Sequence, residues 1–209
     1  VGVAHSMRIF ALDIRPLIAL NSSAHLSRVL GIPVILVVDG VGKSTSIAAQ
    51  VLGYQLLDTR VNIAGVIINK VSSKKTYDIF KEAIEMYTDI KCLGYVPKDE
   101  TLHIGSRHLG LLQAEEIGDL KSKILSLAEV LKETIDVDGI LEIASKVEIE
   151  PVENPFKNEK DKYKGLKIGI AKDRGFSFYY NDNIELLEYL GAEIEYFSPV
   201  ADKKIPENI

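Results

Sequence analysis

Short apolar runs alternate with longer amphipathic segments along most of the chain, and this alternation constrains the fold more than any other feature. The runs at 34–38, 63–68 and 91–96 are rich in valine, isoleucine and leucine, as in strands buried on both faces. Segments with helical spacing of apolar residues lie between them, at 44–57 and 75–87. Strands that alternate with helices of this length predict an α/β fold with a doubly wound parallel sheet.

The ends of the predicted helices carry recognisable signals. At 22–30, Ser22 or Ser23 can cap the first turn, and Gly31 followed by Pro33 is typical of a helix end. The same reasoning predicts two further helices, at 114–133 and 137–145.

The composition changes after Val147. Residues 148–165 are dense in charge, contain two prolines and lack periodicity, which is typical of a solvated linker. A strand, a helix and a strand are then predicted at 166–171, 183–190 and 193–197. Because about 45 residues cannot close an independent α/β sheet, we expect one domain at 1–147, a linker at 148–165 and the opening portion of a second domain at 166–209.

Charge and cysteine content exclude several classes of protein. A net charge of -5 gives no basic field for nucleic acid or an anionic membrane, and the apolar runs are too short to span a bilayer. The single cysteine, Cys92, rules out an internal disulfide and is typical of the reducing cytoplasm. His103 and His108 lack a third ligand at a convincing spacing, so no metal site is predicted. We therefore expect a cytoplasmic protein without a nucleic-acid or membrane partner.

Gly42-Lys43-Ser44-Thr45 follows a predicted strand and opens a predicted helix, which is the setting of a phosphate-binding loop. That motif needs a glycine five residues before Gly42, where this chain has Val37. The favoured interpretation is a tight strand-to-helix turn with a solvent-facing Lys43. A weak anion contact at the helix N-terminus is the alternative.

Three further positions could carry chemistry. Asn69 ends a predicted strand, where ligands bind in such sheets, and its amide could pair with adenine; capping of its own turn is the alternative that spacing alone favours. Arg107 and His108 lie in a charged loop that suits either anion recognition or solubility. Cys92 lacks the glycines of a nucleophile elbow and is interpreted as a small buried hydrophobe.

Several segments together resemble one family, the cobyrinate a,c-diamide synthases. They occur in the family's order over about residues 22–209, and the last three are the most specific. The segments are Ser-Ser-Ala-His-Leu at 22–26, Pro-Val-Ile-Leu-Val-Val-Asp at 33–39, Ala-Gly-Val-Ile-Ile-Asn-Lys-Val at 64–71, Leu-Gly-Tyr-Val-Pro at 93–97, Arg-His-Leu-Gly-Leu at 107–111, Ala-Lys-Asp at 171–173, Phe-Ser-Phe-Tyr-Tyr-Asn-Asp-Asn at 176–183 and Glu-Tyr-Phe-Ser-Pro at 195–199.

The resemblance implies a ligase with two domains. The first is a P-loop NTPase-like domain similar to dethiobiotin synthetase, which binds ATP with Mg²⁺ and a corrinoid. The second is a class I glutamine amidotransferase domain that frees ammonia from glutamine. ATP would activate the a- and c-acetate carboxylates of cobyrinic acid, or of a related tetrapyrrole, and ammonia would displace phosphate. A homodimer is compatible with the resemblance.

The resemblance also assigns expectations to individual residues. Asn69 would contact adenine, with Pro97 near it, and Asp39 would lie on the same rim. Arg107 and His108 would border the nucleotide or substrate cleft. The family's phosphate loop would precede the matching segments and its catalytic cysteine would follow Ile209, so we expect a chain truncated at both ends, with no catalytic residue and no activity alone.

Other functions compete with this one. A related amide synthase is the first alternative: cobyric acid synthase, or a paralogue that amidates hydrogenobyrinate or nickel-sirohydrochlorin. The Phe-Tyr-Tyr segment at 178–180 favours the diamide branch. A nucleotide-binding regulator similar to the ParA and MinD ATPases is the second, and the predicted second α/β opening argues against it. The third is the inactive product of a degraded gene.

Overall fold

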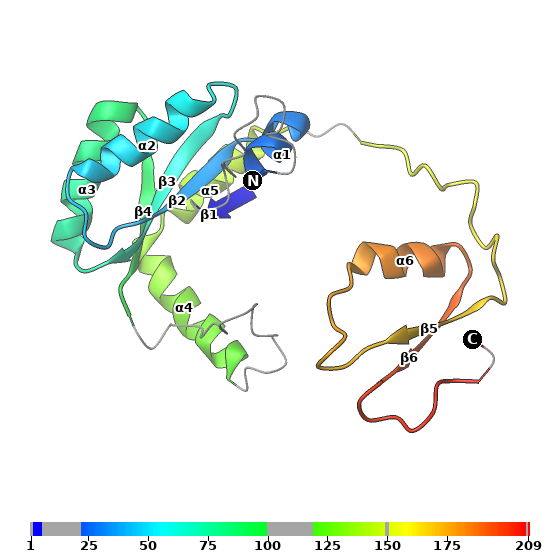
Figure 1. Cartoon of the computed structure of the whole chain (residues 1–209). Coiled ribbons are helices and arrows are strands. Elements are labelled where there is room, and N and C mark those ends of the chain that lie inside the picture. Colours follow the sequence, from blue (N-terminus) through cyan, green and yellow to red (C-terminus); the bar gives the residue numbers. More distant parts are fainter. Residues whose placement is uncertain (1, 6–21, 100–118, 149–150, 208) are drawn as a thin grey trace. The chain divides into compact units, whose positions relative to one another are not determined.

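The computed structural model describes residues 2–5, 22–99, 119–148, 151–207 and 209 of the chain. These form two compact units that divide near residue 150 (Figure 1). None of the described helices is long and apolar enough to cross a membrane. The first unit contains β1 (Gly2–His5), α1 (Ser23–Leu30), β2 (Val34–Asp39), α2 (Ser46–Leu57), β3 (Ile63–Val71), α3 (Lys74–Thr88), β4 (Cys92–Pro97), α4 (Leu120–Thr134) and α5 (Val137–Ser145).

The strands of the first unit form one parallel sheet in the order β1-β2-β3-β4. This confirms the predicted parallel α/β fold, and the three predicted strands correspond to β2, β3 and β4. The register places Asp39 opposite Asn69, and Val71 opposite Pro97. The carboxyl ends of the three strands therefore meet at one edge of the sheet.

Helices cover both faces of this sheet. Leu36 and Ile68 face one side, where they pack in one cluster with residues of α2 and α3, and Figure 1 shows these two helices side by side. Ile35 and Ile67 face the other side, against Ile140 of α5. Every residue of 34–38 is buried, so this continuous apolar run is a strand buried on both faces, as the sequence predicts.

The helix ends show which local signals decide the boundaries. Ser22 caps α1 by accepting a hydrogen bond from the His25 N–H at 3.1 Å, and Gly31 ends the helix with a φ of 63°. Both features were predicted. α2 begins at Ser46, two residues later than predicted, because the residues after β2 are held in a turn instead of entering the helix directly.

The second unit contains β5 (Lys167–Ala171), α6 (Asn181–Tyr189) and β6 (Glu193–Phe197). The two strands pair in parallel along their full length, so the predicted strand–helix–strand opening is present. Part of the charge-dense segment packs with this unit, since the backbone N–H groups of Asp161 and Tyr163 donate to the carbonyls of Tyr189 and Leu190. The proposed limits of the linker, 148–165, stay a prediction.

Asp173 joins the two loops that follow β5 and β6. Its carboxylate accepts hydrogen bonds from the N–H groups of Gly175, Phe176 and Val200 and from the hydroxyl of Ser198. Desolvation acts to raise the pKa of this carboxyl, but the four hydrogen bonds outweigh it and hold the pKa below its usual value. Asp173 thus organises the carboxyl edge of the second sheet.

Candidate functional site

The carboxyl edge of the first sheet brings together three of the five residues that the sequence singled out. Asp39, Asn69 and Pro97 lie at the ends of β2, β3 and β4, and register pairs the first two directly. Ligands of open α/β sheets bind outside this edge. Arg107 and His108 lie outside the described residues.

Asp39 is the centre of the hydrogen bonding at this edge. One carboxylate oxygen accepts from the Val41 N–H at 2.8 Å, and the other forms an ion pair with the Lys70 Nζ at 2.7 Å. Partial burial acts to raise the pKa of Asp39, but the hydrogen bonds from Lys70 and Val41 and the charges of Lys70 and Lys43 hold that pKa below its usual value. Asp39 is therefore ionised at neutral pH.

The Gly-Lys-Ser-Thr segment forms a tight turn. The Lys43 Nζ donates to the main-chain carbonyl of Asp39 at 2.6 Å, so its side chain folds back on its own turn. Gly42 has a φ of 68°, and a Cβ at Gly40 would lie 3.1 Å from the Phe80 ring. This is the geometry of the turn that the spacing favours. That Lys43 holds no phosphate stays a prediction.

Asn69 takes part in a turn of its own. Its side-chain Oδ1 accepts from the N–H of Lys70 at 2.9 Å, and its main-chain carbonyl accepts from the N–H of Gly40 at 2.8 Å. The turn-capping alternative is thus present in the structure. It is compatible with the predicted adenine contact, because the Nδ2 donor and a second lone pair on Oδ1 remain.

Lys70 belongs to this edge, and the sequence did not single it out. Its φ of 58° is a left-handed conformation that costs a residue other than glycine roughly 1–2 kcal/mol. Its ion pair with Asp39 joins side chains that are 52% and 38% exposed, so we expect it to stabilise the fold by only about 0–1 kcal/mol. No signal in the sequence marks a lysine for such a conformation.

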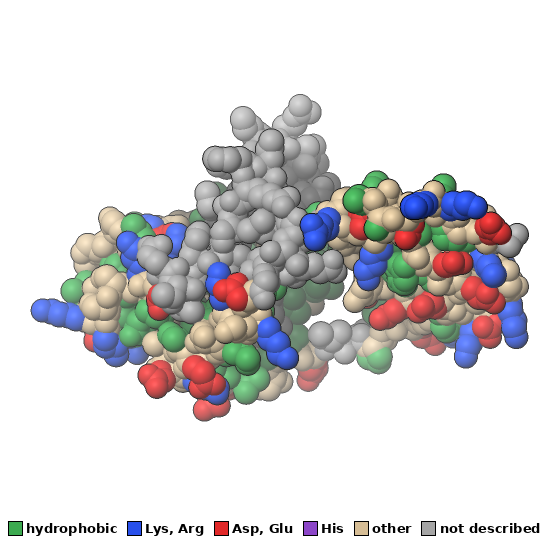
Figure 2. Space-filling model, turned by 90° about the horizontal axis from the view of Figure 1, so that it is seen from below, with side chains coloured by type: hydrophobic (Ala, Val, Ile, Leu, Met, Phe, Trp, Pro, Cys, Tyr) green, Lys and Arg blue, Asp and Glu red, His purple; other side chains and the backbone are tan. Residues whose placement is uncertain are grey.

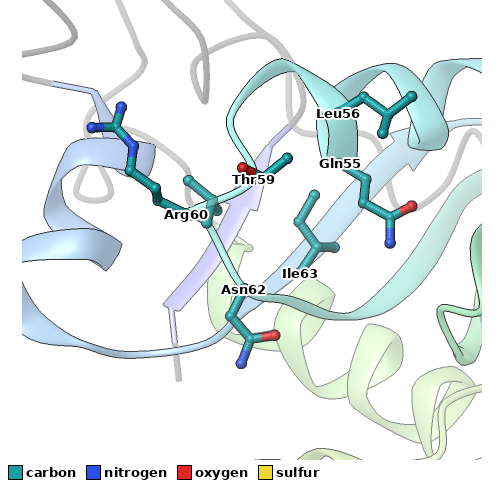
Figure 3. Close-up of a pocket in the computed structure, with 7 residues that line it drawn as sticks. Gln55, Leu56, Thr59, Arg60, Asn62 and Ile63 are labelled. Carbon is teal, nitrogen blue, oxygen red and sulfur yellow. The ribbon is translucent and has the colours of Figure 1, made fainter.

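A separate cavity lies at the opposite edge of the sheet (Figure 3). It is lined by residues that precede or begin β3, and the Arg60 Nε at its rim pairs with the Asp58 carboxylate at 2.8 Å. Because this edge holds the amino ends of the strands, the cavity is not part of the candidate site. Its lining residues are Gln55, Leu56, Thr59, Arg60, Val61, Asn62 and Ile63.

The charged side chains show no preference of sign on the face drawn in Figure 2, where Lys and Arg intermingle with Asp and Glu over the described residues. Within those residues, no group of three or more His, Cys, Asp or Glu side chains could hold a metal ion. Both carboxylate oxygens of Asp39 are engaged, so we assign no metal ligand at this edge.

Cys92 is the first residue of β4 and is 3% exposed. Its backbone N–H donates to the Glu85 carboxylate at 3.0 Å. Burial, and then the negative charge of Glu85, raise the pKa of the thiol to about 12. These features fit the small buried hydrophobe that the sequence predicts and leave no accessible thiolate at neutral pH.

We expect Cys92 to resist alkylation in the folded chain. A shift of the thiol pKa from its ordinary value of 9.0 to about 12 lowers the thiolate fraction at pH 8 roughly a thousandfold, and burial slows the reaction further. Timed iodoacetamide labelling with mass spectrometry, in buffer and in urea, measures this. Equal rates in the two conditions would contradict it. The same thiol should release no ammonia from glutamine, and Cys92→Ser should leave that result unchanged.

A parallel α/β sheet that is covered on both faces and carries polar residues at its carboxyl edge is the architecture of the P-loop NTPase-like class of domain. A family model described as an AAA domain matches residues 14–104. Over about 90% of its length, the chain is similar to proteins described as cobyrinate a,c-diamide synthases. No solved structure matches it.

Three relatives show the extent of the similarity, and each is described as a cobyrinate a,c-diamide synthase. The protein of Fusobacterium nucleatum is 60% identical over 195 residues, which cover 90% of this chain and 44% of the relative. That of Clostridium tetani is 46% identical over 90% of this chain and 41% of its own length. The protein of Clostridium acetobutylicum is 43% identical over 90% of this chain and 42% of its own length. The chain thus spans less than half the length of these relatives.

Proposed function

We propose that this chain forms part of an enzyme that amidates the a- and c-acetate side chains of cobyrinic acid during corrinoid synthesis. The observation that carries the proposal is 60% identity, over 90% of the chain, to a relative described as a cobyrinate a,c-diamide synthase. We further propose ATP as the energy source and glutamine as the nitrogen donor. The protein acts in the cytoplasm, and a homodimer is compatible with this function.

The two units have separate roles in this proposal. The first, at 1–147, is the ATP and corrinoid domain, with the adenine at the edge formed by Asn69, Pro97 and Asp39. Arg107 and His108 border the same cleft. The second, at 166–209, opens a glutamine amidotransferase domain. Mg²⁺, when bound with ATP, neutralises charge on the phosphates. The catalytic groups are expected outside this chain.

A chimeric enzyme tests the proposal. The 195-residue matching segment of the Fusobacterium nucleatum protein is replaced by this chain, and amide formation on cobyrinic acid is measured with ATP and glutamine. Because the two segments are 60% identical, we expect the chimera to form both amides. The unaltered relative is the control. A folded chimera that binds ATP and forms no amide would overturn the proposal.

In this chimera, Asn69→Ala should raise the Michaelis constant for ATP. Loss of a bidentate contact to a base costs about 1–3 kcal/mol, or roughly 5- to 150-fold. Asn69→Asp should weaken ATP binding as well, because it removes a donor and adds a negative charge near phosphates. Discrimination against GTP should fall.

Glutamine hydrolysis by the same variants is the internal control, since that chemistry belongs to the other domain and should change little. Steady-state kinetics with ATP, GTP and glutamine separate these effects. Unchanged ATP affinity together with unchanged nucleotide preference would mean that Asn69 acts only in its turn.

A further inference from the structure

Lys70 has an unusual backbone for its place in the fold. Three residues other than glycine have positive φ within the described part of the chain: Lys70, Asp89 and Asp161. Asp89 ends α3, where a left-handed residue is common, and aspartate tolerates this conformation better than most residues. Lys70 instead lies inside β3, so neither reason applies to it.

The conformation coincides with a break in the sheet. The register between β3 and β4 shifts between Ile68 and Val71, so Asn69 and Lys70 occupy an irregularity of the ladder. Bulges of this kind re-aim side chains and are frequent beside functional sites. This irregularity lies at the carboxyl edge, next to the proposed ligand crevice.

The irregularity turns the Lys70 N–H onto the Asn69 Oδ1. An N–H group can donate only to the oxygen of a carboxamide, so this contact fixes which side of the Asn69 amide is which. The Nδ2 must then point away from the Lys70 N–H. At its other end, Lys70 is tied to Asp39 on the neighbouring strand.

Stability does not explain this arrangement. A left-handed lysine is strained, and an ion pair as exposed as the one with Asp39 offsets little of that strain. Strained residues persist where the surrounding structure holds them, and they gather at functional sites. What the strained backbone of Lys70 does is direct its N–H group onto Asn69 Oδ1, which fixes the orientation of the Asn69 carboxamide.

We propose that Lys70 is a positioning residue, whose bulged backbone and ion pair with Asp39 hold the Asn69 carboxamide with its Nδ2 donor free for a ligand. Only the identity of that ligand rests on the proposed function. The group that meets Asn69 first is then a hydrogen-bond acceptor, such as a purine ring nitrogen. One lone pair of Oδ1 is already in use, so acceptance from a base amino group is the weaker half of any bidentate contact.

The test follows the Asn69 side-chain amide by NMR in the ¹⁵N-labelled chain, with Asn69→Ala to assign its signals. Lys70→Val disfavours the left-handed backbone, because a β-branched residue tolerates it poorly. We expect this change to shift the Asn69 signals and to speed hydrogen exchange at residue 70 about tenfold or more, as befits a lost hydrogen bond. Lys70→Arg should leave both as they are.

A matched control comes from the opposite edge of the sheet. Lys91 pairs with Asp136 at the same 2.7 Å and with similar exposure, 57% and 39%. Lys91→Ala should leave the Asn69 signals unmoved. Should Lys70→Val fail to fold, Lys70→Gly keeps the backbone without strain and removes only the ion pair, and broadened Asn69 signals are then expected. Unmoved signals in both Lys70→Val and Lys70→Gly, or equal shifts with Lys91→Ala, would overturn the proposal.

Titration of the chimeric enzyme and its Lys70 variants with ATP separates this inference from the proposed function. We expect Lys70→Val to weaken ATP binding about 2- to 12-fold, the range for one lost hydrogen bond, and Lys70→Arg to preserve it. A chimera that folds and binds no ATP would count against the proposed nucleotide site. The NMR result would still decide whether Lys70 positions Asn69.

Discussion

Phe80→Ala should lower the free energy of unfolding of the first unit by about 3–5 kcal/mol, the usual cost of emptying a fully buried aromatic site. Phe80 is 1% exposed and packs from α3 into the main core cluster, with Ile68 and Val71 of β3.

The same change should loosen the turn after β2. A Cβ at Gly40 would lie 3.1 Å from the Phe80 ring, which shows how closely this turn rests on the ring. Removing the ring takes away the surface that supports the turn beside Asp39. We therefore expect the backbone amides of Gly40 and Val41 to exchange hydrogen faster in the variant.

Urea unfolding, followed by hydrogen exchange with mass spectrometry, measures both effects and reports on the first unit alone. This matters because a chain of two units need not unfold in one step. Tyr87→Ala on the same helix is the control, since Tyr87 is 62% exposed and should cost less than about 1 kcal/mol. Equal losses for the two variants would show that Phe80 is not a core residue.

The sequence predicted the elements of this fold well because the signals for them are local. The run from Val34 to Val38 is buried residue by residue, and α5 has the bounds that its apolar spacing predicts. The start of α2 was predicted two residues early, at Ser44. The competing interaction was the Lys43 hydrogen bond to Asp39, which pulls the chain into a turn first.

The candidate site was predicted less completely, because its geometry depends on contacts between strands. Asn69 could be placed from the end of its own strand. The contribution of Lys70 could not, because it depends on a register shift against β4 and on an ion pair with a residue 31 positions away. The packing of α5 on one face of the sheet likewise depends on residues far apart in the sequence. Within β4 itself, its one sign is a glycine inside the strand.

That glycine is Gly94, and Gly94→Ala should destabilise the first unit by more than about 4 kcal/mol. Its φ of 124° is one that side chains rarely permit. An added Cβ would overlap the Thr134 carbonyl oxygen and lie 2.7 Å from the Ile135 Cα. Backbone atoms cannot move aside as a flexible side chain would, so strain or displacement must follow.

The displacement would remove the cover of one face of the sheet. Gly94 and Ile135 form an antiparallel bridge, and the Asp136 N–H donates to the Leu93 carbonyl at 2.7 Å. These contacts bring Ile140 and Ile143 of α5 onto the sheet beside Leu93. If the junction before α5 is forced away, Leu93 and its neighbours are exposed to water, and the apolar burial they contribute is lost.

Gly53→Ala provides the opposite expectation within the same unit. Gly53 lies inside α2 with nothing within 4 Å of an added Cβ, so alanine should stabilise the unit by about 0.5–1 kcal/mol through its better helix propensity. Thermal unfolding and limited proteolysis of the two variants measure the contrast. If Gly94→Ala unfolds at the temperature of the parent, α5 does not cover this face. If stability is lost only in Gly94→Ala, then β4 carries a glycine because the backbone at Ile135 lies too close to it for a side chain.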